Sequence, residues 1–185
     1  MPDTLTKDEL LALAAKVLDI EARAVEALKS RLSDDFVDAC DLCMATPGRV
    51  VVTGMGKSGH VSNKIAATLA STGTPAFFMH PAEASHGDLG MLTSNDLLLA
   101  ISYSGETAEV VTILPIVKRL GAKLLSITGN PKSTMAQAAD VHLDISVKEE
   151  ACPLKLAPTA STTATLAMGD ALAVALLEKR GFTAE

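Results

Sequence analysis

The sequence predicts an α/β fold, a three-layer α/β/α sandwich around a five-stranded parallel sheet. Short, continuously apolar runs alternate with helical stretches, and strands that are covered on both faces have this composition. Glycine- or serine-rich turns follow two of these runs, as is typical at the carboxyl ends of parallel strands. With 48% hydrophobic residues in 185, the chain can bury a core. We expect a single domain over residues 1–185, with a helical N-terminal segment at about 4–46 and an α/β core at about 47–185.

Two helices are expected in the N-terminal segment. Thr6 and Glu9 have the spacing of a capping box, and apolar residues recur at helical spacing up to residue 28. A second helix should run from about residue 33 to about residue 46, where Pro47-Gly48 ends it. The apolar face of the first helix needs cover, which favours an oligomer.

Helices should separate the five strands of the core. After the first strand a helix extends to about residue 71, and Pro115 should kink or split the helix that follows the third strand. Asn130 is placed to cap a short helix with Pro131 at its first position. The last helix, at about 158–180, is apolar nearly all round, so it should be buried in the domain or against another subunit. The expected strands are residues 49–53, 75–79, 96–101, 122–127 and 141–145.

Composition excludes several classes of protein. The net charge is -6, so the chain is a poor candidate for nucleic-acid binding, which depends on lysine and arginine. No run of 18 apolar residues appears, and the N-terminus is polar and acidic, so we expect no membrane span and a cytoplasmic location. Aromatic residues make up only 3%, which disfavours base-stacking platforms and aromatic sugar shelves. A small polar ligand that is anchored by a phosphate fits this composition.

Glycine- and hydroxyl-rich turns follow the first and third predicted strands. The first turn reads Gly-Met-Gly-Lys-Ser-Gly-His at 54–60 and has neither the P-loop spacing nor a complete GxGxxG. The second reads Ser-Tyr-Ser-Gly-Glu-Thr at 102–107, where the hydroxyls of Ser102, Ser104 and Thr107 can surround a phosphate without basic residues. A helix N-terminus behind each turn also favours an anion. Ordinary strand-to-helix turns remain an alternative for both.

Four ionisable side chains are candidates for catalysis. Lys57 lies between glycines in the first turn, and His86 precedes a glycine and titrates near neutral pH. Glu109 is in the first turn of its helix, and Glu150 is in the loop before the last helix. A carboxylate in that loop can move a proton next to a carbonyl group. A solvated lysine, solvated glutamates and a structural histidine remain the alternative interpretation.

Other histidines and cysteines are expected to have structural roles. His60 and His80 are weaker candidates for the site, and His142 lies inside a predicted strand. Cys40 and Cys43 form one CxxC without a second pair, so helix packing is expected rather than a zinc site. The odd number of cysteines, three, indicates a reducing compartment.

Three stretches resemble the sugar isomerase (SIS) domain of arabinose-5-phosphate isomerases. They are residues 50–92, which contain GMGKSGH and ASHGDLG, ISYSGETAEV at 101–110, and residues 149–185, which contain EACPLKLAPTASTTATLAMGDALA. The match extends through nearly the whole chain from about Lys16 onward. The resemblance implies a flavodoxin/Rossmann-like fold, commonly a homotetramer, and no organic cofactor. It also implies interconversion of D-ribulose 5-phosphate and D-arabinose 5-phosphate, the entry step to the Kdo sugar of lipopolysaccharide.

The resemblance also assigns roles to residues. Lys57, His86, Glu109 and Glu150 match the positions that are associated with activity in this family. The matching phosphate-binding positions are Gly56, Ser58, Ser102, Ser104, Gly105 and Thr107. No resident metal is implied, and His86 is where we expect an inhibitory metal to bind. Family members continue with a His-Pro-Gly-Gly segment and paired CBS domains, so we expect sugar-phosphate binding but little activity from these 185 residues.

Three other functions remain open at this point. A non-catalytic sugar-phosphate sensor on the same fold would not need four ionisable groups around the sugar carbons, and no helix-turn-helix segment for reading DNA is apparent in the sequence. A related isomerase, such as phosphoheptose isomerase, or a sugar-phosphate lyase would use the same turns. A metal or redox module would use Cys40 and Cys43.

Overall fold

The computed structural model describes residues 5–183 and contains a five-stranded sheet in the order β2-β1-β3-β4-β5. Every strand pair is parallel. The strands are β1 Val50–Thr53, β2 Ala76–Phe78, β3 Leu97–Ile101, β4 Lys123–Thr128 and β5 Val141–Asp144. The predicted parallel α/β fold is therefore confirmed, and each strand lies within one residue of its expected bounds.

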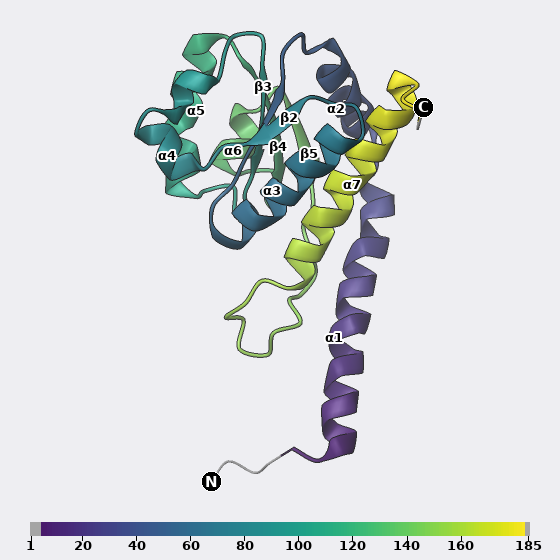
Figure 1. Ribbon diagram of the computed structural model, residues 1–185. Helices are drawn as coiled ribbons and strands as arrows, with labels where there is room; N and C mark the ends of the chain where they lie inside the picture. Colours follow the sequence, from purple (N-terminus) through teal and green to yellow (C-terminus); the bar gives the residue numbers. More distant parts are fainter. Residues whose placement is uncertain (1–4, 184–185) are drawn as a thin grey trace.

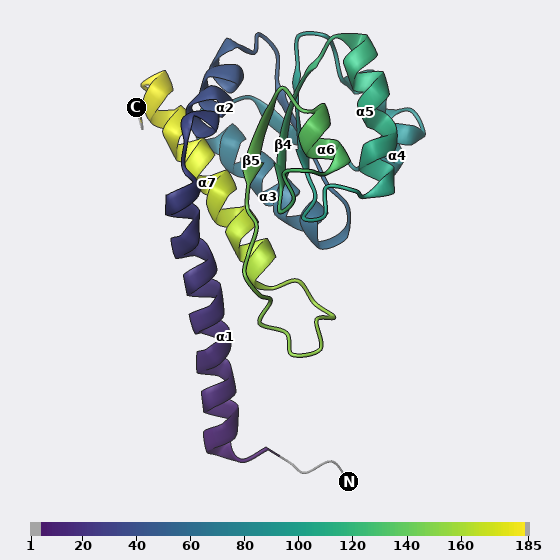
Figure 2. The ribbon, with the colours of Figure 1, turned by 180° about the vertical axis from the view of Figure 1, so that it is seen from behind.

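Helices cover both faces of this sheet (Figures 1 and 2). The larger apolar cluster joins one side of the sheet to α2, α3 and α7, and the other cluster joins the opposite side to α4, α5 and α6. Alternate residues of β1 divide between the clusters: Val50 and Val52 belong to the first and Val51 to the second. The helices are α1 Lys7–Leu28, α2 Asp34–Ala45, α3 Gly56–Ser71, α4 Pro81–Ser85, α5 Ala108–Leu120, α6 Thr134–Ala138 and α7 Ala160–Arg180.

The first helix begins at the predicted capping box. The backbone N–H of Glu9 donates to Thr6 Oγ1 (3.3 Å), and the backbone N–H of Thr6 donates to the Glu9 carboxylate (2.8 Å). The C-terminal half of α1 packs on α7, but the N-terminal half extends away from the sheet (Figure 1). Several leucines of α1 are exposed, among them Leu11 at 59% and Leu18 at 69%.

The last helix, α7, is long and apolar enough to cross a membrane by length and composition, with a mean hydropathy of 1.4. Half of that apolar stretch is buried, and α7 packs against α1, α2 and α3. Nine of its residues are buried, including Ala164, Leu172 and Leu176 at 0% exposure. Burial within the domain accounts for this half of the stretch, whereas the other half, with Val174 53% exposed, is not covered by the domain, and cover by another subunit stays a prediction. Gly181 ends α7 in a left-handed conformation.

Three helical stretches of the core differ from the sequence expectations in detail. Of the kink or split expected at Pro115, the split does not occur: α5 is continuous through Pro115, which is exposed while Val110, Ile113 and Leu114 are buried. Asn130 does not cap α6: its side chain accepts from the Lys132 amide (3.0 Å) in a local turn, and the helix begins only after Ser133. The stretch after β2, for which no helix was expected, contains α4 and a 3₁₀ turn at Asp88–Met91.

A buried carboxylate ties the start of β3 to the start of β1. Asp96 is 3% exposed and accepts from the Arg49 amide (2.7 Å), the Thr93 amide (2.8 Å) and the Thr93 hydroxyl (2.8 Å). Burial, the largest influence, raises the pKa of Asp96, but these hydrogen bonds outweigh it and hold the pKa below the ordinary 3.8. The unfolded state therefore binds the proton more tightly than the folded state does.

We expect Asp96→Asn to lower the free energy of unfolding by about 1–3 kcal/mol at pH 7, because three donors lose a charged acceptor. The stabilisation by the Asp96 carboxylate is present above the pKa that Asp96 has in the unfolded state. It is lost as the pH falls through the lower pKa that Asp96 has in the folded state. As the pH falls below about 4, the free energy of unfolding of the variant should therefore decrease less than that of the unaltered chain. Urea unfolding from pH 7 to pH 3 measures both effects, with the exposed Asp38→Asn as the matched control.

Candidate functional site

The carboxyl ends of β1, β3 and β4 lie side by side and bring the polar turns to one edge of the sheet. Thr53 is in register with Ala100, and Ile101 is in register with Ile127. The turn 102–107 therefore lies between the turn after β1 and the turn after β4. This is the crevice in which open parallel sheets bind their ligands.

The turn 102–107 presents a cluster of hydroxyl groups. Ser102 Oγ lies 2.7 Å from Thr107 Oγ1 and 3.3 Å from Ser104 Oγ. Thr107 is the N-cap residue of α5, but its side chain does not cap the helix and its hydroxyl is bonded to that of Ser102 instead. These hydroxyl groups lie at the N-terminus of a 13-residue helix, a place that favours an anion, and phosphate binding there stays a prediction.

Gly105 shapes this turn through its conformation and its close packing. Its φ is +68°, in the left-handed region that favours glycine, and an added Cβ would overlap the Ser133 side chain. The following residue, Glu106, directs its carboxylate to the Thr134 amide at the start of α6 (2.7 Å). This hydrogen bond holds the negative charge of Glu106 outside the cluster of hydroxyl groups.

The turn after β1 keeps the features that the sequence predicts. Gly56 has φ +59° and open space around the position of a Cβ, and α3 begins there. Lys57 is exposed and Ser58 is half-buried in the first turn of this 16-residue helix. A cation and helix amides therefore lie at the same sheet edge as the hydroxyl cluster.

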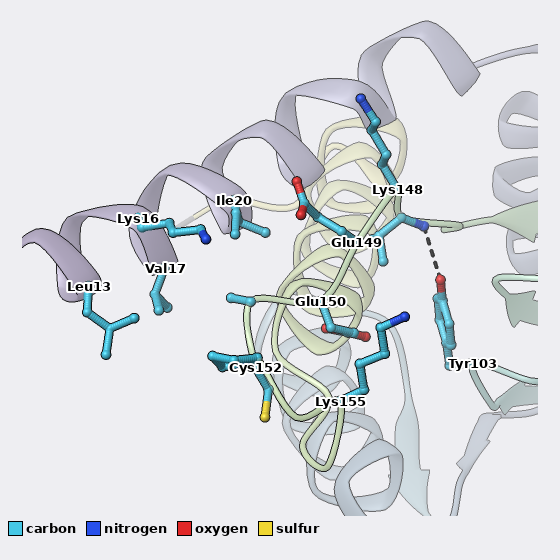
Figure 3. Close-up of a pocket in the computed structure, with 13 residues that line it drawn as sticks. Leu13, Lys16, Val17, Ile20, Tyr103, Lys148, Glu149, Glu150, Cys152 and Lys155 are labelled. Carbon is cyan, nitrogen blue, oxygen red and sulfur yellow. Dashed lines mark hydrogen bonds between the residues drawn. The ribbon is translucent and has the colours of Figure 1, made fainter. Parts of the chain in front are cut away.

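A cavity of about 490 Å³ connects this edge to α1 and to the loop before α7 (Figure 3). It is lined by Tyr103 from the hydroxyl-rich turn, by Glu150 and Cys152 from the loop, and by Lys16 from α1. The Tyr103 hydroxyl accepts from the Val147 amide (3.2 Å) and so fastens the loop to the turn. The structure thus brings Glu150 and one residue of the predicted phosphate turn, Tyr103, to one cavity, while the hydroxyl groups of Ser102, Ser104 and Thr107 do not line it.

Glu150 is held as a carboxylate at the N-terminus of α7. Its Oε2 accepts from the Thr159 amide (2.8 Å), the Thr159 hydroxyl (2.9 Å) and the Ser161 amide (3.3 Å). Burial, the largest influence, raises the pKa of Glu150, but the hydrogen bonds from Ser161 and Thr159 outweigh it and lower the pKa below its ordinary value. The side chain is therefore ionised at neutral pH and able to accept a proton.

The other three catalytic candidates lie on exposed turns. Lys57 is at the start of α3, Glu109 is in the first turn of α5, and His86 follows the last residue of α4. None of the three lines the cavity that contains Glu150. The structure places Lys57 and Glu109 at the carboxyl edge but does not gather all four side chains in one pocket of the single chain.

The weaker histidine candidates occupy a second hollow. His60 and His80 line a cavity of about 170 Å³ together with Gly56 of the first turn. His142 is half-buried in β5, and its Nδ1 lies 3.0 Å from Ser126 Oγ. Burial, the largest influence, lowers the pKa of His142, which fits the structural role expected for it.

The cysteines of α2 serve packing, as predicted. Cys40 and Cys43 belong to the larger apolar cluster, and burial raises the pKa of Cys43 to about 12. Within residues 5–183 no group of three or more histidine, cysteine or acidic side chains is placed to hold a metal ion. Across that part of the chain, the arrangement lends no support to a metal or redox module at these cysteines.

The family comparison matches the SIS domain to residues 44–175, which is more than half of the chain and includes both polar turns and Glu150. The chain belongs to the SIS domain family. A solved SIS-fold structure, Escherichia coli CFT073 c3406 in complex with arabinose 5-phosphate, superimposes with a TM-score of 0.94 at 42% identity, over 97% of this chain and 96% of that chain.

Two curated relatives of this SIS domain are named arabinose 5-phosphate isomerase KdsD. The Pseudomonas aeruginosa protein is 66% identical over 172 residues, which are 93% of this chain and 53% of the relative. The Escherichia coli (strain K12) protein is 59% identical over 170 residues, which are 92% and 52% of the two chains. This SIS domain therefore spans about half the length of the curated relatives that it matches.

Sequence reasoning missed two residues that shape the site of this SIS domain. Tyr103 is the one tyrosine of an aromatic-poor chain and lies inside the Ser-Tyr-Ser-Gly-Glu-Thr turn, a position that could have singled it out. Thr159 gave no such signal, because its contact with Glu150 joins residues nine apart across an irregular loop. Both residues position other parts of the site: Tyr103 holds the loop before α7, and Thr159 holds the carboxylate of Glu150.

Proposed function

We propose that this SIS domain catalyses the reversible isomerisation of D-ribulose 5-phosphate and D-arabinose 5-phosphate. The observation that carries the proposal is the cavity that Glu150, an ionised carboxylate, shares with Tyr103 of the hydroxyl-rich turn. An anion site next to a base is what an aldose–ketose isomerase of phosphorylated sugars requires. The names of the KdsD relatives and the arabinose 5-phosphate complex of the c3406 neighbour support this substrate.

In the proposed reaction, the hydroxyls of Ser102, Ser104 and Thr107, with Gly56, Ser58 and Gly105 beside them, hold the phosphate of the substrate. Glu150 removes a proton from C1 of the ketose while the C2 carbonyl oxygen gains a proton, which gives an enediol. Return of a proton to C2 and loss of the proton from the C1 hydroxyl then give the aldose. The reaction redistributes hydrogens within the sugar and needs no organic cofactor.

The remaining candidates are proposed to act on the sugar oxygens. Lys57 stabilises the negative charge that develops on oxygen, by its position and its own charge. His86 moves protons between the two oxygens, and Glu109 orients or assists it. The exposure of all three at turns around the sheet is compatible with these roles, because a bound sugar must reach them from solvent.

A panel of sugar phosphates incubated with the purified chain in deuterated water tests the proposed function. Proton NMR should show conversion of D-ribulose 5-phosphate to D-arabinose 5-phosphate, slow for these 185 residues alone, with deuterium incorporated at C1 or C2. Binding of these sugars without conversion or exchange would point instead to a sugar-phosphate sensor. Preferential conversion of a heptose phosphate would favour a related SIS isomerase.

The setting of the reaction is also part of the proposal. We propose one SIS domain per chain and a homotetramer, supported by the exposed leucines of α1 and by Leu154 and Leu156, which are 74% and 78% exposed. Three free cysteines fit a cytoplasmic location, where the product would enter synthesis of the Kdo sugar of lipopolysaccharide. The proposed partner is a small sugar phosphate, with no role for nucleic acid or membrane.

A further inference from the structure

We propose that Thr159 is a positioning residue, which fixes one oxygen of Glu150 so that the other is available for proton transfer. The inference rests on the proposed function, because it assigns Glu150 the role of the base. Thr159 is not one of the four ionisable candidates, and it does not belong to the hydroxyl-rich turn. Glu150 lines the cavity in Figure 3, and its hydrogen bonds join it to the start of α7.

The hydrogen bonds to Glu150 all converge on one of its two oxygens. Thr159 supplies two of them, from its amide (2.8 Å) and from its hydroxyl (2.9 Å), and the Ser161 amide supplies the third (3.3 Å). Every one of these bonds ends on Oε2. Within residues 5–183, Oε1 has no hydrogen-bond donor, so its lone pairs remain available to a substrate proton.

Thr159 is itself held in place from the other side. Its Oγ1 accepts from the Ala151 amide (2.8 Å), so the residue next to Glu150 in the chain fixes the hydroxyl that binds Glu150. This closed ring of contacts restricts the rotation of the carboxylate. A base whose position is fixed before the substrate binds loses less entropy in the reaction.

The beginning of α7 contains a further polar group that ordinary helix capping does not explain. The Ser161 hydroxyl is buried, at 1% exposure, and makes no hydrogen bond of normal geometry within the described part of the chain, yet it lies close enough to Glu150 to contribute to the lowered pKa of that carboxyl. It therefore supports the ionised carboxylate together with Thr159. It lies in the same turn as the two amides that bind Oε2.

Charged and titratable groups line the same cavity as Glu150. Figure 3 shows Lys155 on the side of Glu150 and Glu149 directed to the opposite side. The influences on the pKa of Glu150 are nevertheless burial and the hydrogen bonds from Ser161 and Thr159, with no charged neighbour among them. The groups that face the cavity are Lys16, Tyr103, Lys148, Glu149, Cys152 and Lys155.

The test compares Thr159→Val with Thr159→Ser. Valine keeps the shape and the amide but removes the hydroxyl, so kcat/KM on the acidic side should fall about tenfold and the acidic limb of the pH profile should move to higher pH. Serine keeps the hydroxyl and should restore both. Thr162→Val is the matched control, because the Thr162 hydroxyl donates to the Thr159 carbonyl (2.8 Å) and not to Glu150.

A second measurement does not depend on catalysis. The ¹³C shift of the Glu150 carboxyl carbon, assigned with Glu150→Gln, is followed against pH. We expect a pKa below that of an ordinary glutamate in the unaltered chain, a higher one in Thr159→Val and an unchanged one in Thr162→Val. An ordinary pKa in the unaltered chain, or the same pKa in Thr159→Val, would overturn the proposal even if that variant melts early. Loss of the proposed function would appear separately, as no isomerisation by the unaltered chain.

Discussion

Glu150→Gln will reduce isomerisation of D-ribulose 5-phosphate by about 10²–10⁴-fold, the usual contribution of a positioned general base. Glutamine has the same shape, and its carbonyl oxygen can still accept from the Thr159 amide and hydroxyl, so the start of α7 should keep its structure. What disappears is the negative oxygen that takes the proton from C1. The rate is measured by proton NMR, and deuterium incorporation should fall with it.

The matched control is the neighbouring carboxylate. Glu149 is exposed and lies 4.0 Å from Arg23 in a surface ion pair, so Glu149→Gln should leave turnover within about twofold of the unaltered chain. If Glu150→Gln isomerises nearly as fast as that control, Glu150 is not the base. Glu109, the other carboxylate among the candidates, would then take its place.

Local signals in the sequence predicted those parts of the fold that depend on neighbouring residues. The capping box of Thr6 and Glu9 requires contacts only three residues apart, and it begins α1 as expected. The strands were found because parallel strands that are buried on both faces must be apolar throughout. Asn130 failed as a cap because Ser133, three residues later, offers the same chemistry, and the sequence does not rank the two.

The candidate site was only partly predictable, for a similar physical reason. The hydroxyl-rich turn could be recognised because Ser102, Ser104 and Thr107 are close in the chain. The contact between Tyr103 and Val147 joins residues 44 apart, and the clamp on Glu150 depends on the path of the loop at 145–159. Such contacts follow from tertiary packing, which periodicity and motif spacing do not encode.

Gly105→Ala is expected to have the largest effect on the phosphate turn. Alanine at φ +68° costs about 1–2 kcal/mol, and the added methyl group overlaps Ser133, at a further cost of about 1–3 kcal/mol. Ser133 is fully buried and its hydroxyl caps α6 through the Ala136 amide (3.3 Å), so it has little room to move. The turn must shift instead, which separates the hydroxyls of Ser102 and Thr107.

Comparison with Gly56→Ala separates the two costs of Gly105→Ala, the conformational cost of the positive φ and the steric cost of the added methyl group. Gly56 has nearly the same φ, +59°, but open space where a Cβ would lie, so alanine there costs only the conformational part. Gly105→Ala should therefore unfold at lower urea than Gly56→Ala. It should also raise KM for the sugar phosphate at least tenfold, because a shift that weakens binding by about 1.4 kcal/mol is a factor of ten.

Equal stability of the two variants would mean that the turn yields to the methyl group without strain. An unchanged KM in Gly105→Ala would mean that the phosphate does not bind at this turn, because a shift of the backbone at residue 105 must disturb the hydroxyl cluster.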